Sequence, residues 1–205
     1  MMELFHGPLS CSMATRIALA EAGEEVVVTR VVLSTKKTAD GRDYFKINPV
    51  GQVPALITRE GTVLTEGPAV LQYVADLHPE TGLAPDARSF ARYELQKWLN
   101  LIASEVHKQI FAVLFNPGTP PEAKAYAKSI APSRFDHLAR HLEGREFLLD
   151  QFTVADCYLV TALNWAQRSG FDLQKWPALA AYFDRLMARP SVASVMADDV
   201  TAAAA

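Results

Sequence analysis

One change of hydrophobic spacing constrains the fold of this chain more than any other feature. Up to about residue 78, short apolar runs at strand spacing are interleaved with helical stretches, whereas beyond about residue 86 every apolar series has helical spacing. The segment between them, 78–86, contains several turn-forming residues and no periodicity. The sequence therefore predicts an α/β domain at 1–80 and an all-α domain at 87–205.

The first domain shows a strand-helix-strand order. Leu4 and Phe5 begin a short strand, and Ser12 is the expected N-cap of a helix that Gly23 ends. Residues 26–32 then form a β-branched strand, which should pair parallel with the first. The polar stretch 34–48 is interpreted as a loop and a helix. A hairpin and one more helix complete the order β-α-β-α-β-β-α, which is typical of a thioredoxin-like fold.

The segment 50–67 contains this hairpin and a helix start. Two apolar runs flank Gly61, the expected tight position of the turn. Pro54 should mark the start of the first strand, which leaves the backbone of Val53 available for another partner. Glu66 and Gly67 precede the next helix, so a carboxylate and backbone amides meet at a helix N-terminus. This arrangement suits an extended, zwitterionic peptide, although an ordinary hairpin with an edge proline is the alternative.

Cys11 stands between two serines immediately before a predicted helix. A thiolate there would face unpaired backbone amides and the positive end of the helix dipole, both of which lower the pKa of a thiol. We therefore expect a reactive thiol, the alternative being a small buried apolar side chain. No second cysteine follows three residues later, which excludes a CxxC dithiol. Cys157 lies within a helical pattern and is expected to be structural.

The second domain is expected to be a series of helices. One long helix carries apolar residues from Leu95 to Val113, and a second runs to about residue 141. Thr153 and Asp156 form a capping box for a helix over 154–168. A last helix is expected over 177–187, followed by a tail of small residues.

His107, Ser104 and Asn100 share one face of the long helix, because their spacings are three and seven residues. This face differs from the apolar one, so the three residues form either a polar site or an ordinary solvated surface. The histidines show no metal-ligand spacing in a suitable context, and we expect no metal site.

Composition excludes some partners. The 205 residues carry a net charge of −3, with a pI of about 6.0, so no basic field favours nucleic acid or an anionic membrane surface. The apolar runs are too short to span a bilayer, and the N-terminus does not resemble a signal peptide. The two cysteines do not suggest a disulfide framework. These features favour a cytoplasmic protein.

Five segments together resemble the bacterial beta class of glutathione S-transferases: FHGPLSCSMATRIAL, INPVGQVPAL, LTEGPAVLQYVADLHP, KWLNLIASEVHK and FTVADCYL. The resemblance extends to about Asp198 and implies the glutathione transferase fold, with a cis peptide bond before Pro54. It implies catalytic and glutathione-contacting roles for Cys11 and His107. It also implies glutathione contacts from Lys36, the backbone of Val53, Glu66, Gly67, Asn100 and Ser104. One departure is His6, where this class usually has a tyrosine.

Two functional hypotheses follow from the residues and the resemblance. The first is a glutathione transferase acting on small hydrophobic electrophiles, with a Cys11-dependent thiol exchange and glutathione as co-substrate. The second is a non-catalytic ligand-binding or regulatory protein of the same fold, which the presence of Cys11, Glu66 and His107 together disfavours. In either case we expect a two-fold symmetric homodimer, with some glutathione contacts supplied by the partner.

Overall fold

The computed structural model describes residues 1–204 and divides into two compact units. The first comprises Met1–Ala84 together with the chain from Arg189 onward, and the second is Pro85–Ala188. The expected domain 87–205 therefore needs correcting at its C-terminal end. The tail of small residues is a helix, α8 (Pro190–Ala204), which packs against helix α1 (Met13–Ala22) of the first unit. Val192 and Val195 bury their side chains there, which removes apolar surface from water.

Within the described residues, the first unit holds a five-stranded sheet with the order β3-β2-β1-β4-β5. Its strands are β1 (Met2–His6), β2 (Val26–Val32), β3 (Lys37–Thr38), β4 (Ala55–Ile57) and β5 (Val63–Thr65). The predicted parallel pair is present between β1 and β2, and the predicted hairpin between β4 and β5. Strand β1 also pairs antiparallel with β4, so the sheet is mixed and thioredoxin-like.

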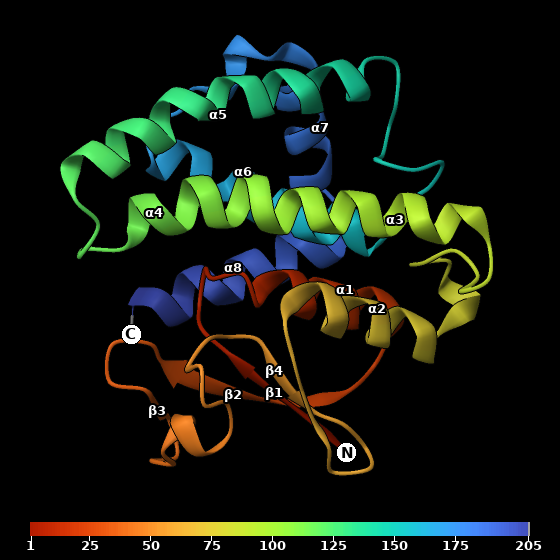
Figure 1. Cartoon of the computed structure of the whole chain (residues 1–205). Helices are drawn as coiled ribbons and strands as arrows, with labels where there is room; N and C mark the ends of the chain where they lie inside the picture. Colours follow the sequence, from red (N-terminus) through yellow and green to blue (C-terminus); the bar gives the residue numbers. More distant parts are fainter. Residues whose placement is uncertain (205) are drawn as a thin grey trace. The chain divides into compact units, whose positions relative to one another are not determined.

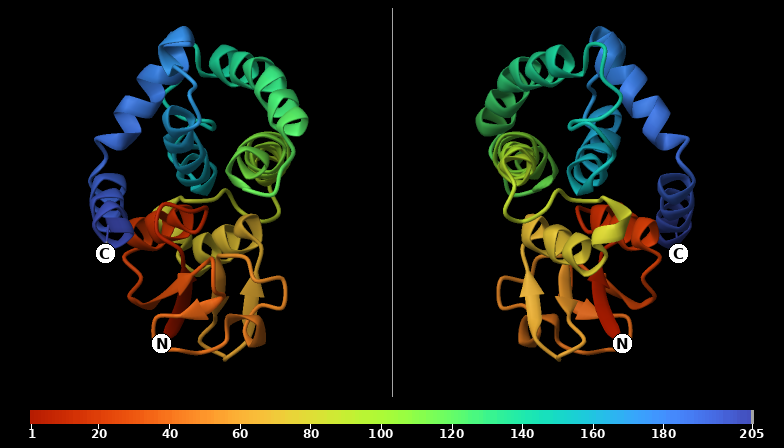
Figure 2. Two further views of the ribbon diagram at one scale, coloured as in Figure 1. Left: turned by 90° about the vertical axis from the view of Figure 1, so that its left-hand side faces the viewer. Right: turned by 90° about the vertical axis from the view of Figure 1, so that its right-hand side faces the viewer.

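Helices α1, α2 (Gly67–Leu77) and α8 lie on one face of this sheet (Figures 1 and 2). Helix α1 ends, as predicted, at Gly23, whose left-handed φ of 65° costs a glycine little. The helix expected within 34–48 is only the single 3₁₀ turn η1 (Tyr44–Lys46), preceded by the two-residue strand β3. Asp43 caps this turn, and its short length reflects a polar segment with few apolar residues to bury. A second 3₁₀ turn, η2 (Pro79–Thr81), lies in the expected linker.

The second unit is helical throughout its regular structure. It contains α3 (Phe90–Leu101), η3 (Ile102–Phe111), α4 (Ala112–Phe115), α5 (Pro121–Leu142), α6 (Val154–Arg168), η4 (Leu173–Lys175) and α7 (Pro177–Met187). The predicted long helix is present as α3, η3 and α4 in succession, but its middle ten residues form a π-helix. Helix α6 is buried on nearly all sides, as expected of a helix that is apolar around its circumference.

Candidate active site

Cys11 lies in the loop between β1 and α1, with its side chain partly exposed. Its Sγ donates a hydrogen bond to the carbonyl oxygen of Val53, at 2.9 Å. Val53 immediately precedes β4, and the Val53–Pro54 peptide bond is cis. Strand β4 begins after Pro54, as the sequence predicted, and leaves the Val53 carbonyl outside the ladder. The first unit thus places the Cys11 thiol beside the end of the hairpin that lies away from its turn.

The start of α1 differs from the expected arrangement. Ser12 occupies the N-cap position, but its hydroxyl makes no capping bond. The amides of Met13 and Ala14 are taken by the carbonyls of Ser10 and Cys11, at 3.0 and 3.2 Å. The turn at residues 10–14 therefore uses two backbone amides that we expected to face the Cys11 thiol. Because a carbonyl oxygen accepts from a thiol and repels a thiolate, Cys11 must leave Val53 when it ionises.

The loop that carries Val53 is held from three directions. Tyr44 donates its hydroxyl to the carbonyl of Gln52 at 2.7 Å, and Asn48 donates its side-chain amide to the same oxygen at 2.7 Å. Burial raises the pKa of Tyr44 to about 12, so the phenol keeps its proton. Lys36 donates its Nζ to the carbonyl of Gly51 at 2.8 Å. These bonds fix the backbone onto which Cys11 docks.

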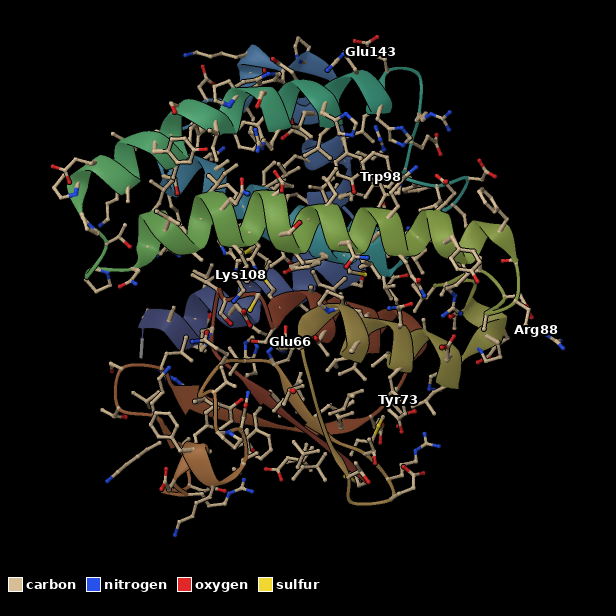
Figure 3. The ribbon with its side chains drawn as sticks, in the orientation of Figure 1. Glu66, Tyr73, Arg88, Trp98, Lys108 and Glu143 are labelled. Carbon is tan, nitrogen blue, oxygen red and sulfur yellow. The ribbon has the colours of Figure 1, made fainter. Side chains whose placement is uncertain are left out.

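Glu66 is exposed at the N-cap of α2, where its backbone has φ 68° and ψ 114° (Figure 3). Such a conformation is rare for a side chain larger than glycine and costs on the order of 1–3 kcal/mol, and strain of this kind gathers at functional sites. Ala55 pairs with Thr65 in the hairpin, so Glu66 directly follows the end of β5 that pairs with the start of β4. The carboxylate therefore stands at the same end of the sheet as Cys11.

His6 ends β1 and is fully enclosed, with 3% of its surface exposed. Its Nδ1 lies 2.8 Å from the Ser12 hydroxyl, and its Nε2 lies 2.9 Å from the carboxylate of Asp199 in α8. Asp199 also accepts from the amide of Leu9 at 2.8 Å. Burial opposes ionisation of Asp199, but the interactions with His6, Leu9 and Arg16 together outweigh it and lower the pKa of this carboxyl. The C-terminal helix thus anchors both ends of the loop that carries Cys11.

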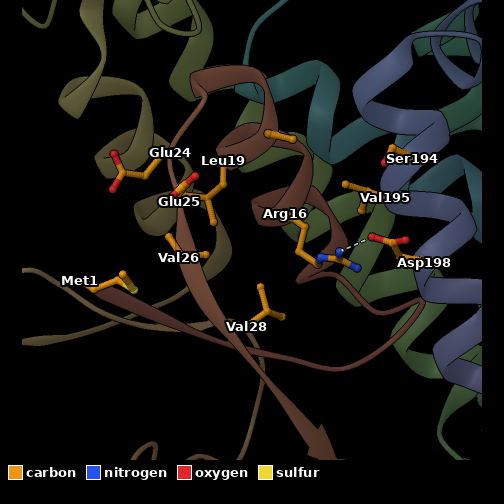
Figure 4. A pocket seen from close by; sticks show the side chains of 11 residues that line it. Met1, Arg16, Leu19, Glu24, Glu25, Val26, Val28, Ser194, Val195 and Asp198 are labelled. Carbon is orange, nitrogen blue, oxygen red and sulfur yellow. Dashed lines mark hydrogen bonds and ion pairs between the residues drawn. The ribbon is translucent and has the colours of Figure 1, made fainter.

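Arg16 of α1 strengthens this anchor. Its guanidinium pairs with Asp199 and, at 2.9 Å, with the neighbouring Asp198 (Figure 4). The pair with Asp198 lines an open hollow of about 460 Å³ between α1, β2 and α8. Arg189, just before α8, forms a two-pronged ion pair with Glu21, both bonds being 2.6 Å long. Charged groups therefore hold α8 to α1 just before its first residue and again at Asp198 and Asp199.

His107 lies in η3, partly buried against helix α6 of the second unit. Its Nδ1 is 2.7 Å from the hydroxyl of Tyr158, and its ring centroid is 5.0 Å from that of Trp165. Burial, with a smaller contribution from the charge of Lys108, lowers the pKa of His107 to about 4. The imidazole is therefore neutral at pH 7, and can donate or accept a hydrogen bond but carries no charge.

Asn100 and Ser104 are exposed, whereas His107 is partly buried. The Ser104 hydroxyl donates to the backbone carbonyl of Asn100 at 2.9 Å. Ser104 and His107 lie in the π-helix η3, whereas Asn100 lies in α3.

Thr153 and Asp156 form the predicted capping box at the start of α6. The Asp156 carboxylate accepts from the amides of Thr153 and Leu148, at 2.8 and 2.9 Å, and from the hydroxyl of Tyr182 at 2.8 Å. Asp156 has no exposed surface, so this network holds the segment before α6 onto the core.

Two residues that hold the candidate site in place, Tyr158 and Asp199, were not predicted from the sequence. Tyr158 lies in the quoted segment FTVADCYL, but nothing in its spacing indicated that it would bond a histidine 51 residues away. Asp199 lies in the expected small-residue tail, where an acidic side chain suggests an exposed surface. Two acidic residues in an otherwise apolar, helix-favouring stretch were the available signal.

Two features are absent from residues 1–204. No group of three or more His, Cys, Asp or Glu side chains could hold a metal ion there. In the same residues, no helix is both long enough and apolar enough to cross a bilayer.

The chain matches known proteins along most of its length. The family model described as glutathione S-transferase, N-terminal domain, matches residues 1–76, and the model of the C-terminal domain matches 102–190. Glutathione S-transferase GstA of Escherichia coli O157:H7 is 40% identical over 192 residues, covering 93% of this chain and 95% of the relative.

Solved structures show the same likeness. A bacterial beta class glutathione S-transferase from Sphingomonas chungbukensis is 39% identical, with a TM-score of 0.92. A sphingomonad glutathione S-transferase complexed with glutathione is 40% identical, also with a TM-score of 0.92. Each comparison covers 96% of this chain and 98% of the other.

Proposed function

Because the chain belongs to the glutathione S-transferase family, with its likeness to the bacterial beta class, we propose that it uses glutathione as co-substrate and Cys11 as its reactive thiol. The observation that carries this proposal is the hydrogen bond between Cys11 and the Val53 carbonyl, beside Lys36 and Glu66. A thiol, a strand end, a cation and a carboxylate thus meet at one end of the sheet. They complement the groups of glutathione.

The tripeptide would lie extended along the end of the hairpin. Its central backbone pairs with Val53, its γ-glutamyl ammonium meets Glu66 beside the Gly67 amide, and its glycine carboxylate meets Lys36. Lys36 already donates a hydrogen bond to the Gly51 carbonyl. When glutathione binds, Lys36 would exchange this neutral oxygen for a charged oxygen of the glycine carboxylate. Asn100 and Ser104, both exposed, are proposed to contact the tripeptide, with the partner chain supplying some of these contacts.

We further propose two reactions at this site. In conjugation, the glutathione thiolate attacks a small hydrophobic electrophile and displaces its leaving group, with the sulfur–carbon bond formed as the old bond breaks. In thiol exchange, the Cys11 thiolate attacks the glutathione sulfur of a mixed disulfide between glutathione and a small thiol. A Cys11–glutathione disulfide forms and the small thiol leaves as its thiolate. A glutathione thiolate then attacks the glutathione sulfur of this disulfide, which releases oxidised glutathione and regenerates Cys11. His107 would steady the departing thiolate in thiol exchange.

The experiment compares Cys11→Ala with the parent chain in two assays, conjugation of a chlorodinitrobenzene-type electrophile and glutathione-dependent reduction of a mixed disulfide between glutathione and a small thiol. We expect reduction to collapse while some conjugation survives, because bound glutathione keeps its own sulfur. Loss of conjugation with intact reduction would show that the roles are assigned wrongly. A parent chain inactive in both assays yet binding glutathione would favour the ligand-binding alternative.

Mass spectrometry supplies an independent measurement. After exposure to oxidised glutathione, Cys11 should carry the tripeptide and Cys157 should not. Cys157 has no exposed surface and serves as an internal control within the same molecule. Modification of Cys157 alone would contradict the assignment of the reactive thiol.

A homodimer is also proposed, and exposed aromatic residues on α3 support it. Phe90 and Tyr93 have 76% and 63% of their surfaces exposed. Large apolar side chains at such exposure are characteristic of interaction surfaces. Light scattering at micromolar concentration should give twice the chain mass, and a monomer mass would contradict the proposal. Phe90→Ser and Tyr93→Ser together should shift the equilibrium toward monomer.

A further inference from the structure

His107 is held by one tyrosine and packed against one tryptophan, both from helix α6. The imidazole and the Tyr158 ring meet edge to face at 85°, with the Nδ1–hydroxyl distance of 2.7 Å. Tyr158 and Trp165 have 3% and 4% of their surfaces exposed, so both are rigidly placed. Nδ1 of His107 is therefore occupied by a hydrogen bond within the protein. Within residues 1–204, Nε2 forms no hydrogen bond with another side chain or with the backbone.

The chemistry of this hydrogen bond decides which nitrogen carries the proton. Neutral imidazole has one N–H and one bare nitrogen, and the bond made by one nitrogen sets the state of the other. A bare imidazole nitrogen is a strong acceptor, whereas a phenol oxygen is a weak one because its lone pair is shared with the ring. Tyr158 should therefore donate its hydroxyl to a bare Nδ1. The proton of His107 then resides on Nε2.

We propose that Tyr158 is a positioning residue that fixes His107 as the Nε2–H tautomer, which makes His107 a neutral hydrogen-bond donor to sulfur and not a general base. This inference rests on the proposed function, in which His107 steadies the departing thiolate. A neutral N–H stabilises an anion without first having to acquire a proton. A histidine whose Nε2 was bare would instead repel the same sulfur anion.

The test is the ¹⁵N spectrum of the His107 side chain in the full-length protein. The parent chain at pH 7 should show protonated Nε2 and bare Nδ1. Tyr158→Phe should populate the other tautomer, because the phenyl ring keeps the packing and removes the donor. Tyr182→Phe is the matched control, since it removes a buried hydroxyl that bonds Asp156 and leaves His107 untouched. Protonated Nδ1 in the parent chain would overturn the proposal, even where Tyr158→Phe fails to fold.

Activity then separates this inference from the proposed function. Tyr158→Phe should lower kcat for the glutathione-dependent reaction about tenfold, with the Kd for glutathione unchanged within about twofold. Tyr182→Phe should leave kcat unchanged. An unchanged kcat in Tyr158→Phe, with the tautomer shifted, would refute the donor role but not the transferase activity. A parent chain that shows the Nε2–H tautomer and no activity would instead count against the proposed function alone.

Discussion

The neutral His107 gives the protein a measurable acid sensitivity. Its pKa is about 4 in the folded chain, against 6.5 for an ordinary histidine, because burial disfavours the charged ring. Between those pH values the unfolded chain binds a proton that the folded chain does not. The free energy of unfolding therefore falls as the pH is lowered from 6.5, and this contribution is complete below about pH 4.

The magnitude follows from the same pKa values. The gap between 6.5 and about 4, at about 1.36 kcal/mol for each pH unit, corresponds to about 3 kcal/mol when fully developed. At about pH 4.5 the loss should already be about 2.5 kcal/mol, because the unfolded histidine is then almost fully protonated and the folded one only partly. Above about pH 7.5 the group contributes nothing.

His107→Gln isolates this contribution. Glutamine does not titrate, and its amide can keep the hydrogen bond to Tyr158. Urea unfolding of both proteins from pH 7.5 to 4.5 should show the parent losing about 2.5 kcal/mol more than the variant. Other titrating groups affect both proteins equally and cancel in the difference. His137→Gln, a change at an exposed histidine of α5, controls for removing a histidine as such. Parallel pH profiles for the parent chain and His107→Gln would refute the reasoning.

Three further changes probe the rest of the structure. Asp156→Ala should lower the free energy of unfolding by about 3–5 kcal/mol, because it leaves buried donors, including the Tyr182 hydroxyl, without an acceptor. Urea unfolding at pH 7 measures this loss, and a loss under about 1 kcal/mol would contradict the prediction. Asp199→Asn should cost about 2–4 kcal/mol by the same measurement, since it removes the buried charge that pairs with Arg16, and an unchanged midpoint would show that α8 does not anchor the loop. Glu66→Ala should weaken glutathione binding by about 1.5–3 kcal/mol, roughly ten- to a hundredfold, and calorimetry showing unchanged affinity would exclude Glu66 as the main anchor.

Local signals predicted much of the backbone. The left-handed conformations at Gly23 and Gly61, and the capping box of Thr153 and Asp156, each depend on residues within a few positions of one another. The order along the chain of β1, α1, β2, β4, β5 and α2, and the positions of α5, α6 and α7, follow from apolar spacing in the same way. Each of these features is decided by which conformations a short segment can adopt, so the sequence carries the information directly.

The surroundings of the candidate site were decided by packing across the chain. His6 meets Asp199 across 193 residues, and His107 meets Tyr158 across 51. The π-helical winding of η3, which carries Ser104 and His107, cannot be read from a spacing that assumes an α-helix. The sequence alone determined the strand and helix order and the residue types that carry the chemistry. Only the tertiary structure decided that Cys11 bonds a carbonyl and that His107 is neutral, because burial and hydrogen bonds to distant segments form only when the elements pack.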